Sequence, residues 1–89
     1  MSLIEKARIK INEIDAKMIE LFKERIQAVM QVLEYKKEDN LAVFDEKREI
    51  ELIAKNIKLL NDSELEKYYL KFFQGVLESS KDYQRDHYE

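Results

Sequence analysis

The chain has 89 residues, with 16 Lys or Arg against 19 Asp or Glu, and a formal net charge of −3. It contains no cysteine or proline and only one glycine and one histidine. Disulfides, thiolate metal sites, catalytic Ser-His-Asp triads, zinc-binding histidine clusters and glycine-rich phosphate loops are therefore excluded. Tight hairpins of a β-sheet also need glycine and proline, so the composition predicts an all-α fold.

The same composition argues against several classes of binding partner and cellular location for this protein. A mildly acidic chain is a poor ligand for nucleic acid, whose binding needs a basic face. No stretch approaches the ~20 apolar residues of a membrane span, and residues 1–6 do not resemble a signal peptide. We expect a cytoplasmic protein with no nucleic-acid or membrane partner, folded as one domain over residues 1–89.

The first predicted helix runs from Leu3 to Glu38. Its apolar residues recur at the three- and four-residue spacing of an amphipathic helix: Ile4, Ala7, Ile11, Ile14, Met18, Leu21, Phe22, Ala28, Val29 and Val32. Such a helix would be ~54 Å long, whereas a compact domain of this size has a radius of gyration of only ~12 Å. Its own chain cannot cover it, so we infer a dimer built around this helix.

Two shorter helices are predicted downstream. Asp45 has the position of an N-cap for the second, whose apolar residues are Ile50, Ile53, Ile57 and Leu60. A polar break at Asn61 follows, and Ser63-x-x-Glu66 has the pattern of a capping box that opens the third helix. The sequence therefore predicts three helices, the first much longer than the others.

Several polar residues stand where the helical pattern calls for apolar ones. Cations interrupt the first helix at Arg8, Arg25 and Lys36, and Ser80 and Gln84 continue an apolar face of the third. Taken singly, each has an ordinary structural explanation, because a lone arginine usually extends its charged end to solvent. Three inward cations together are costly unless anions neutralise them, so the set predicts a bound dianion.

The spacing of these cations adds a geometric constraint. Arg8 and Arg25 are separated by ~25 Å along one helix, because each residue adds 1.5 Å. They cannot hold the same small ligand from one chain. If the long helix packs antiparallel against its copy, however, Arg8 of one protomer can approach Arg25 of the other. The pattern thus predicts two shared, cation-lined pockets in each dimer.

Together, these residues resemble one known family. The pattern comprises Arg8, Ile14-Asp15, Leu21, Glu24-Arg25, Val32, Lys36, Asp45-x-x-Arg48-Glu49, Ser80 and Gln84. It is similar to that of the all-helical, AroQ-type chorismate mutases. The resemblance implies an intertwined homodimeric helical bundle that needs no cofactor and no metal. It also implies the conversion of chorismate to prephenate, a step of the shikimate pathway toward phenylalanine and tyrosine.

The resemblance assigns a role to each residue. Arg25 and Arg8 of the other subunit would grip the substrate carboxylates, and Ser80 would assist. Lys36 would contact a carboxylate and the breaking ether oxygen, which Gln84 would also hydrogen-bond. The remaining assignments concern the ring hydroxyl, the shape of the site and its apolar walls: Glu49 and the backbone of Asp45 for the hydroxyl, Arg48 for the shape, and Val32, Leu52 and Leu77 for the walls. Lys81 stands where relatives often carry an apolar residue.

Two other functions compete with this interpretation. Isochorismate pyruvate lyase shares the fold and a similar cation set, but the acid at Glu49 favours the mutase because it suits the ring alcohol of chorismate. A non-catalytic helical dimerisation module would explain the long apolar stripe. It gives no reason for inward Arg25, Lys36 and Gln84.

Overall fold

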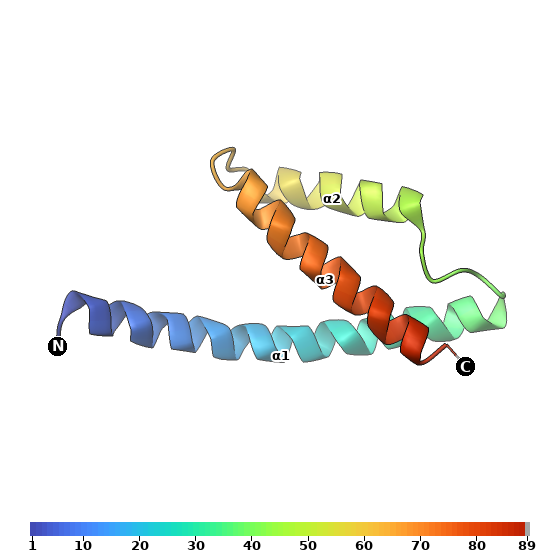
Figure 1. Ribbon diagram of the computed structural model, residues 1–89, viewed down its shortest axis with the longest axis horizontal. Coiled ribbons are helices and arrows are strands. Elements are labelled where there is room, and N and C mark those ends of the chain that lie inside the picture. The colour runs from blue at the N-terminus through green and yellow to red at the C-terminus, as the bar shows by residue number, and fades with distance from the viewer. Residues whose placement is uncertain (89) are drawn as a thin grey trace.

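The structure is a computed structural model that describes residues 1–88. It consists of α1 (Leu3–Glu38), α2 (Glu46–Leu60) and α3 (Glu66–Asp86), and residues 1–88 contain no strand (Figure 1). The predicted all-α fold with one long N-terminal helix is therefore confirmed. The single chain is elongated, with extents of 56 × 27 × 16 Å and a radius of gyration of 16.3 Å.

Helix α1 has both ends specified by short polar residues. The Ser2 hydroxyl accepts a hydrogen bond from the Glu5 amide at 3.2 Å, which satisfies one of the free donors of the first turn. The helix ends before Asp39, and Asn40 then takes a left-handed conformation with φ of 54°. Asparagine tolerates that conformation better than most residues, so the chain can turn there toward α2.

Helix α2 begins as predicted, with Asp45 as its N-cap. The Asp45 carboxylate accepts a hydrogen bond from the Arg48 amide at 3.0 Å. The helix ends at Asn61, which has a φ of 48° and whose amide bonds back to the carbonyl of Ile57. A left-handed residue at this position is a common way to stop a helix.

The predicted capping box at the start of α3 is wrong. Asp62, one residue before Ser63, accepts hydrogen bonds from the amides of Glu64 at 3.1 Å and Leu65 at 3.3 Å. The helix proper starts at Glu66, and Leu65 at the N-cap position makes no side-chain capping bond. In the predicted capping box the Ser63 hydroxyl would have accepted a hydrogen bond from the Glu66 amide, whereas the observed acceptor is the Asp62 carboxylate and its donors are the amides of Glu64 and Leu65.

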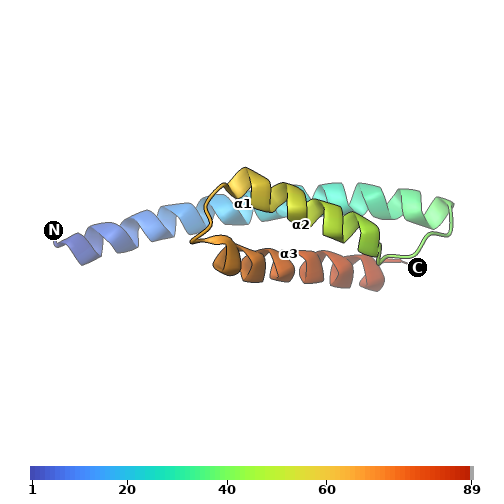
Figure 2. The same ribbon diagram turned by 90° about the horizontal axis from the view of Figure 1, so that it is seen from above.

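Helix α3 holds the chain together. It packs against α1 on one side and α2 on the other, while α1 and α2 do not pack on each other within the described residues. The small core consists of Leu33, Phe73 and Leu77, with the side chain of Gln84 also buried. Figures 1 and 2 both show the N-terminal part of α1 extending well beyond α2 and α3. Every residue in the range 1–24 is exposed.

Candidate active site

A small cavity lies where the C-terminal half of α3 meets the end of α1 and the start of α2. Its volume is about 100 Å³. All three helices and the loop between α1 and α2 contribute to its lining, which consists of Lys36, Val43, Asp45, Arg48, Glu49, Leu52, Leu77, Ser80, Lys81 and Gln84. Six of the eight predicted site residues thus come together around one space, although up to 48 positions separate them in the sequence.

Lys36 reaches the cavity from the last turn of α1. Its Nζ donates a hydrogen bond to the carbonyl oxygen of Val43 at 2.6 Å. The Leu41 amide donates to the Lys36 carbonyl at 2.8 Å, so the loop folds back over the end of the helix. A neutral carbonyl holds the ammonium group in place without cancelling its charge.

Gln84 is the most buried polar side chain of the described core, at 6% exposed. Its Nε2 donates a hydrogen bond to the Val29 carbonyl at 3.1 Å, on the neighbouring turns of α1. An amide nitrogen carries two N–H groups, and this bond uses one of them. Gln84 is therefore fixed in position and retains donor capacity at the cavity that it lines.

Arg25 lies on the facing side of α1 and meets the site through Ser80. Its Nη1 donates a hydrogen bond to the Ser80 hydroxyl, which in turn donates to the Val76 carbonyl at 2.8 Å. Burial lowers the pKa of Arg25, and Tyr69 opposes that effect. An arginine remains protonated at neutral pH even so, which leaves a half-buried charge beside a neutral partner.

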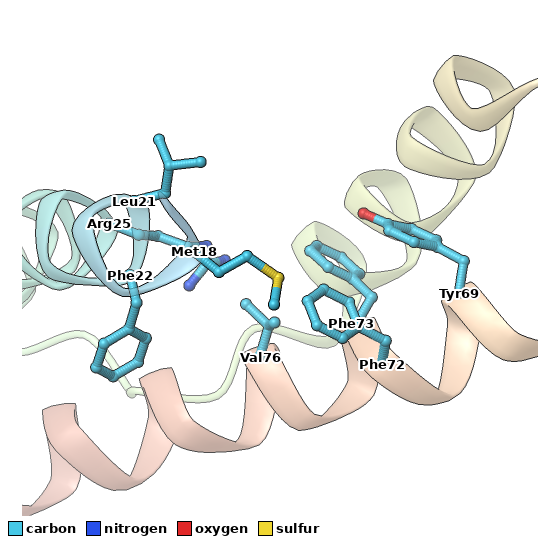
Figure 3. A pocket seen from close by; sticks show the side chains of 8 residues that line it. All are labelled: Met18, Leu21, Phe22, Arg25, Tyr69, Phe72, Phe73 and Val76. Atoms are coloured by element: carbon cyan, nitrogen blue, oxygen red, sulfur yellow. The ribbon is translucent and has the colours of Figure 1, made fainter. Parts of the chain in front are cut away.

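Arg25 also lines an apolar groove between α1 and α3, with a volume of about 350 Å³ (Figure 3). The other lining residues are almost all apolar or aromatic: Met18, Leu21, Phe22, Tyr69, Phe72, Phe73 and Val76. Met18 and Phe22 point toward α3, whereas Leu21 points away from it. The groove adjoins the polar cavity, because Ser80 in the cavity wall binds Arg25 in the groove.

The charges around the cavity are unbalanced. Within residues 1–88, no carboxylate lies within ion-pair distance of Arg25, Lys36 or Arg48. Arg25 and Lys36 are partly buried, whereas Arg48 is exposed. Partly buried cations without anionic partners are costly, and an anion that binds beside them removes that cost. The same residues contain no group of acidic or histidine side chains that could hold a metal ion, and no helix suited to crossing a membrane.

A model of the chorismate mutase type II family matches residues 7–85. The chain belongs to this family. No curated protein and no solved structure matches it. The predicted resemblance is confirmed, and all eight predicted site residues lie within the matched segment. Membership in the chorismate mutase type II family supports an isomerase reaction on chorismate.

Two expectations for the chorismate mutase site are not met within one chain. Arg8 lies near the start of α1, is exposed, and is ~25 Å from Arg25 along the helix axis. Val32, expected as an apolar wall, is half-exposed and does not line the cavity, whereas Leu52 and Leu77 do. Both Arg8 and Val32 are on the surface of α1 that the rest of the chain leaves uncovered.

The structure adds site features that the sequence did not reveal. The Val43 carbonyl holds Lys36, and a backbone group leaves no trace in residue identity. Lys81 forms an ion pair with Glu49, with 3.2 Å between Nζ and Oε2. The unusual lysine was visible in the sequence, but its partner is 32 residues away on another helix. Only the tertiary structure identifies that partner.

Proposed function

We propose that the chain is a chorismate mutase that rearranges chorismate to prephenate in two sites shared between the protomers of a homodimer. The observation that carries this proposal is the pair of unneutralised cations held by neutral acceptors, Lys36 in the cavity lining and Arg25 in the adjoining groove. Chorismate is a dicarboxylate, so it supplies the anionic groups that this chain lacks.

The reaction needs no catalytic nucleophile and no proton transfer. In a [3,3] rearrangement the ether C–O bond breaks while a C–C bond forms, and no proton, hydride or nucleophile is transferred. The enzyme has to fold the enolpyruvyl arm over the ring and hold it there. It also has to stabilise the negative charge that develops on the ether oxygen. An active site without cysteine or histidine can do both.

Lys36 and Gln84 would stabilise the negative charge that develops on the ether oxygen. Both line the cavity, and both are fixed by hydrogen bonds to backbone carbonyls of their own chain, those of Val43 and Val29. Donors that are already oriented need no rearrangement as the C–O bond breaks, which is the source of their effect on rate.

The arginines would bind the two carboxylates of the substrate. The planar guanidinium of Arg25 binds a carboxylate through two parallel hydrogen bonds, and Ser80 beside it offers a further hydroxyl. Arg8 from the other protomer would grip the second carboxylate, and Arg48 would shape the wall. Glu49 and the backbone of Asp45 would hydrogen-bond the ring hydroxyl of the substrate, since both lie at the N-terminus of α2, which borders the cavity.

The dimer is supported by what one chain leaves incomplete. A cavity of about 100 Å³ is well below the ~300 Å³ at which small-molecule pockets usually begin. The apolar side chains in the range 1–24 are all exposed, and a second copy of α1 packed antiparallel would cover them. That arrangement would also bring its Arg8 toward Arg25.

Incubation of the purified protein with chorismate tests the proposal. We expect loss of the ultraviolet absorbance of chorismate and prephenate as the product identified by chromatography. Lys36→Ala should lower kcat by ~10²–10³-fold with unchanged circular dichroism, because it removes a donor that acts in the transition state. Lys10→Ala serves as the matched control, since Lys10 is exposed on the same helix and its ion-pair partner among residues 1–88 is Glu13 alone.

Other outcomes of this assay are equally informative. A folded protein that does not consume chorismate would contradict the mutase. Release of pyruvate from isochorismate by that protein would then identify a lyase, and inactivity on both substrates would favour a binding module. An unchanged kcat in Lys36→Ala would remove Lys36 from the catalytic role.

A further inference from the structure

Lys81 differs from every other cation at the cavity, because carboxylates surround it. Its Nζ lies 3.2 Å from Glu49 Oε2 and 3.0 Å from Glu78 Oε1. It also lies 4.8 Å from the centre of the Phe44 ring, a favourable distance for a cation over an aromatic face. Its side chain is only 13% exposed. The ammonium group is thus held from the loop, α2 and α3 at once.

The ion pair with Lys81 offsets the negative charge of Glu49, the residue at which a negatively charged substrate would be repelled. Glu49 lines the same cavity as the unpaired cations, and a dianionic substrate next to a bare carboxylate would be repelled. The charged groups that line the cavity with Glu49 are Lys36 from α1, Asp45 and Arg48 from the start of α2, and Lys81 from α3. Of the cations, only Lys81 is within ion-pair distance of the Glu49 carboxylate among residues 1–88.

We propose that Lys81 is a positioning residue for substrate binding, which holds the Glu49 carboxylate against the cavity wall and offsets its charge. The hydrogen bond from Lys81 on α3 to Glu49 on α2 restricts the rotamers of Glu49. The carboxylate oxygen that accepts a hydrogen bond from the ring hydroxyl is therefore oriented before the substrate binds. The pair also allows a cyclic hydroxy-dicarboxylate to bind beside an acid. This inference rests on the proposed function, since it concerns how the same site recognises its hydroxyl group.

The test compares Lys81→Met with wild type in the chorismate assay. Methionine keeps most of the length of lysine and loses the charge. We expect KM to rise about tenfold while kcat changes less than about twofold, because the contact to the hydroxyl exists equally in the bound and transition states. Lys81→Arg should restore most of the affinity, since it keeps a cation at the carboxylate. A variant that had only lost stability would not show this split or this rescue.

Two further variants separate the partners of Lys81. Glu78→Gln is the matched control: its carboxylate contacts the same ammonium group but is 63% exposed and does not line the cavity, so KM should stay within about twofold of wild type. In a Glu49→Gln background, Lys81→Met should have almost no additional effect, because its action passes through Glu49. If Lys81→Met does not fold, Lys81→Gln takes its place in the same cycle.

The outcomes distinguish this inference from the proposed function. An active wild type with Lys81→Met unchanged in KM would overturn the inference alone. An effect of Lys81→Met that persists at full size without the Glu49 carboxylate would also overturn it, because Lys81 would then act directly on the substrate. A folded wild-type protein without activity on chorismate would overturn both.

Discussion

Residues 3–24 and the remainder of α1 belong to one continuous helix but have different surroundings. The first part carries apolar residues such as Ile4, Ile11 and Leu21 on its surface, and all of its residues are exposed in the single chain. The second part contains Leu33, the most buried residue of the described chain at 1% exposed. The two parts nevertheless share the same helical periodicity.

This difference separates helix formation from helix burial. The i to i−4 hydrogen bonds of α1 are local and need no tertiary contact, although a helix in water gains most of its stability from a packed apolar face. The second part of α1 obtains that packing from α3. Met18 and Phe22 of the first part point toward α3, but most of its apolar face has no neighbour in the single chain. We therefore propose that a second copy covers this face.

The sharpest test of the comparison uses one arginine from each part of α1. We expect Arg8→Ala and Arg25→Ala each to lower kcat/KM by ~10²–10³-fold, because each removes a charged carboxylate contact. When the two variants are mixed and allowed to exchange subunits, about a quarter of the wild-type activity should return, since half of the dimers are mixed and each has one intact site. The measurement is chorismate turnover before and after exchange.

Each arginine variant should keep its circular dichroism and its dimeric mass, which serve as controls for folding and assembly. Full activity in Arg8→Ala would remove the first part of α1 from the site. Failure of exchanged mixtures to regain activity would show that the site does not use both protomers in the proposed way.

Two leucines of α1 provide a test through stability. Leu33→Ala should cost ~2–5 kcal/mol, the usual range for removing a leucine from a packed core. Leu21 is 61% exposed in the single chain, where its replacement by alanine would cost less than ~0.5 kcal/mol. If a partner covers Leu21, we expect a clearly larger loss and an unfolding midpoint that rises with protein concentration.

Urea unfolding of both leucine variants at two protein concentrations measures these effects. A midpoint that does not depend on concentration, together with a negligible effect at Leu21, would leave the first part of α1 without a partner.

A smaller effect is expected at Gly75, the only glycine of the chain, which lies inside α3. A Cβ atom built there would meet nothing within 4 Å. Gly75→Ala should therefore raise the free energy of unfolding by ~0.5–1 kcal/mol, because alanine loses less backbone entropy in a helix. Destabilisation instead would indicate that another chain approaches this face of α3 closely. Thermal unfolding of the variant decides between the two.

The smallest expected effect is the pH dependence of the Lys81 ion pairs. The hydrogen bond with Glu78 raises the pKa of Lys81 above its usual 10.5; burial opposes this, and the Glu49 carboxylate adds to it. The stabilisation is therefore complete below the usual value and is lost as the pH rises through the folded-state pKa. The stability difference between wild type and Lys81→Met should shrink toward alkaline pH. Urea midpoints over about pH 9 to 11.5 measure it, and a constant difference would contradict the assignment.

Local structure was largely predictable because its causes are local. The bounds of α1 and the N-cap at Asp45 follow from apolar periodicity and from a carboxylate placed three residues before a free amide. The start of α3 was not predicted correctly, because Asp62 and Ser63 are adjacent residues and either type can cap the start of a helix. Which of them binds depends on the path of the chain out of α2.

The candidate site was predictable to the extent that its residues break the helical pattern. Arg25, Lys36 and Gln84 each interrupt an apolar face, and it is the set of inward cations, rather than any one residue, that predicts a bound anion. The acceptors that fix them were not predictable. Val43 and Val29 contribute backbone carbonyls, which every residue possesses.

The sequence by itself determined the three helices, their apolar faces and the set of charged residues that face inward, because period and polarity are properties of neighbouring positions. Only the tertiary structure decided that six of the predicted site residues surround one cavity, that Lys81 is paired with Glu49, and that residues 1–24 are left bare. Those facts depend on how α3 crosses α1 and α2, which is set by packing between residues far apart in the chain.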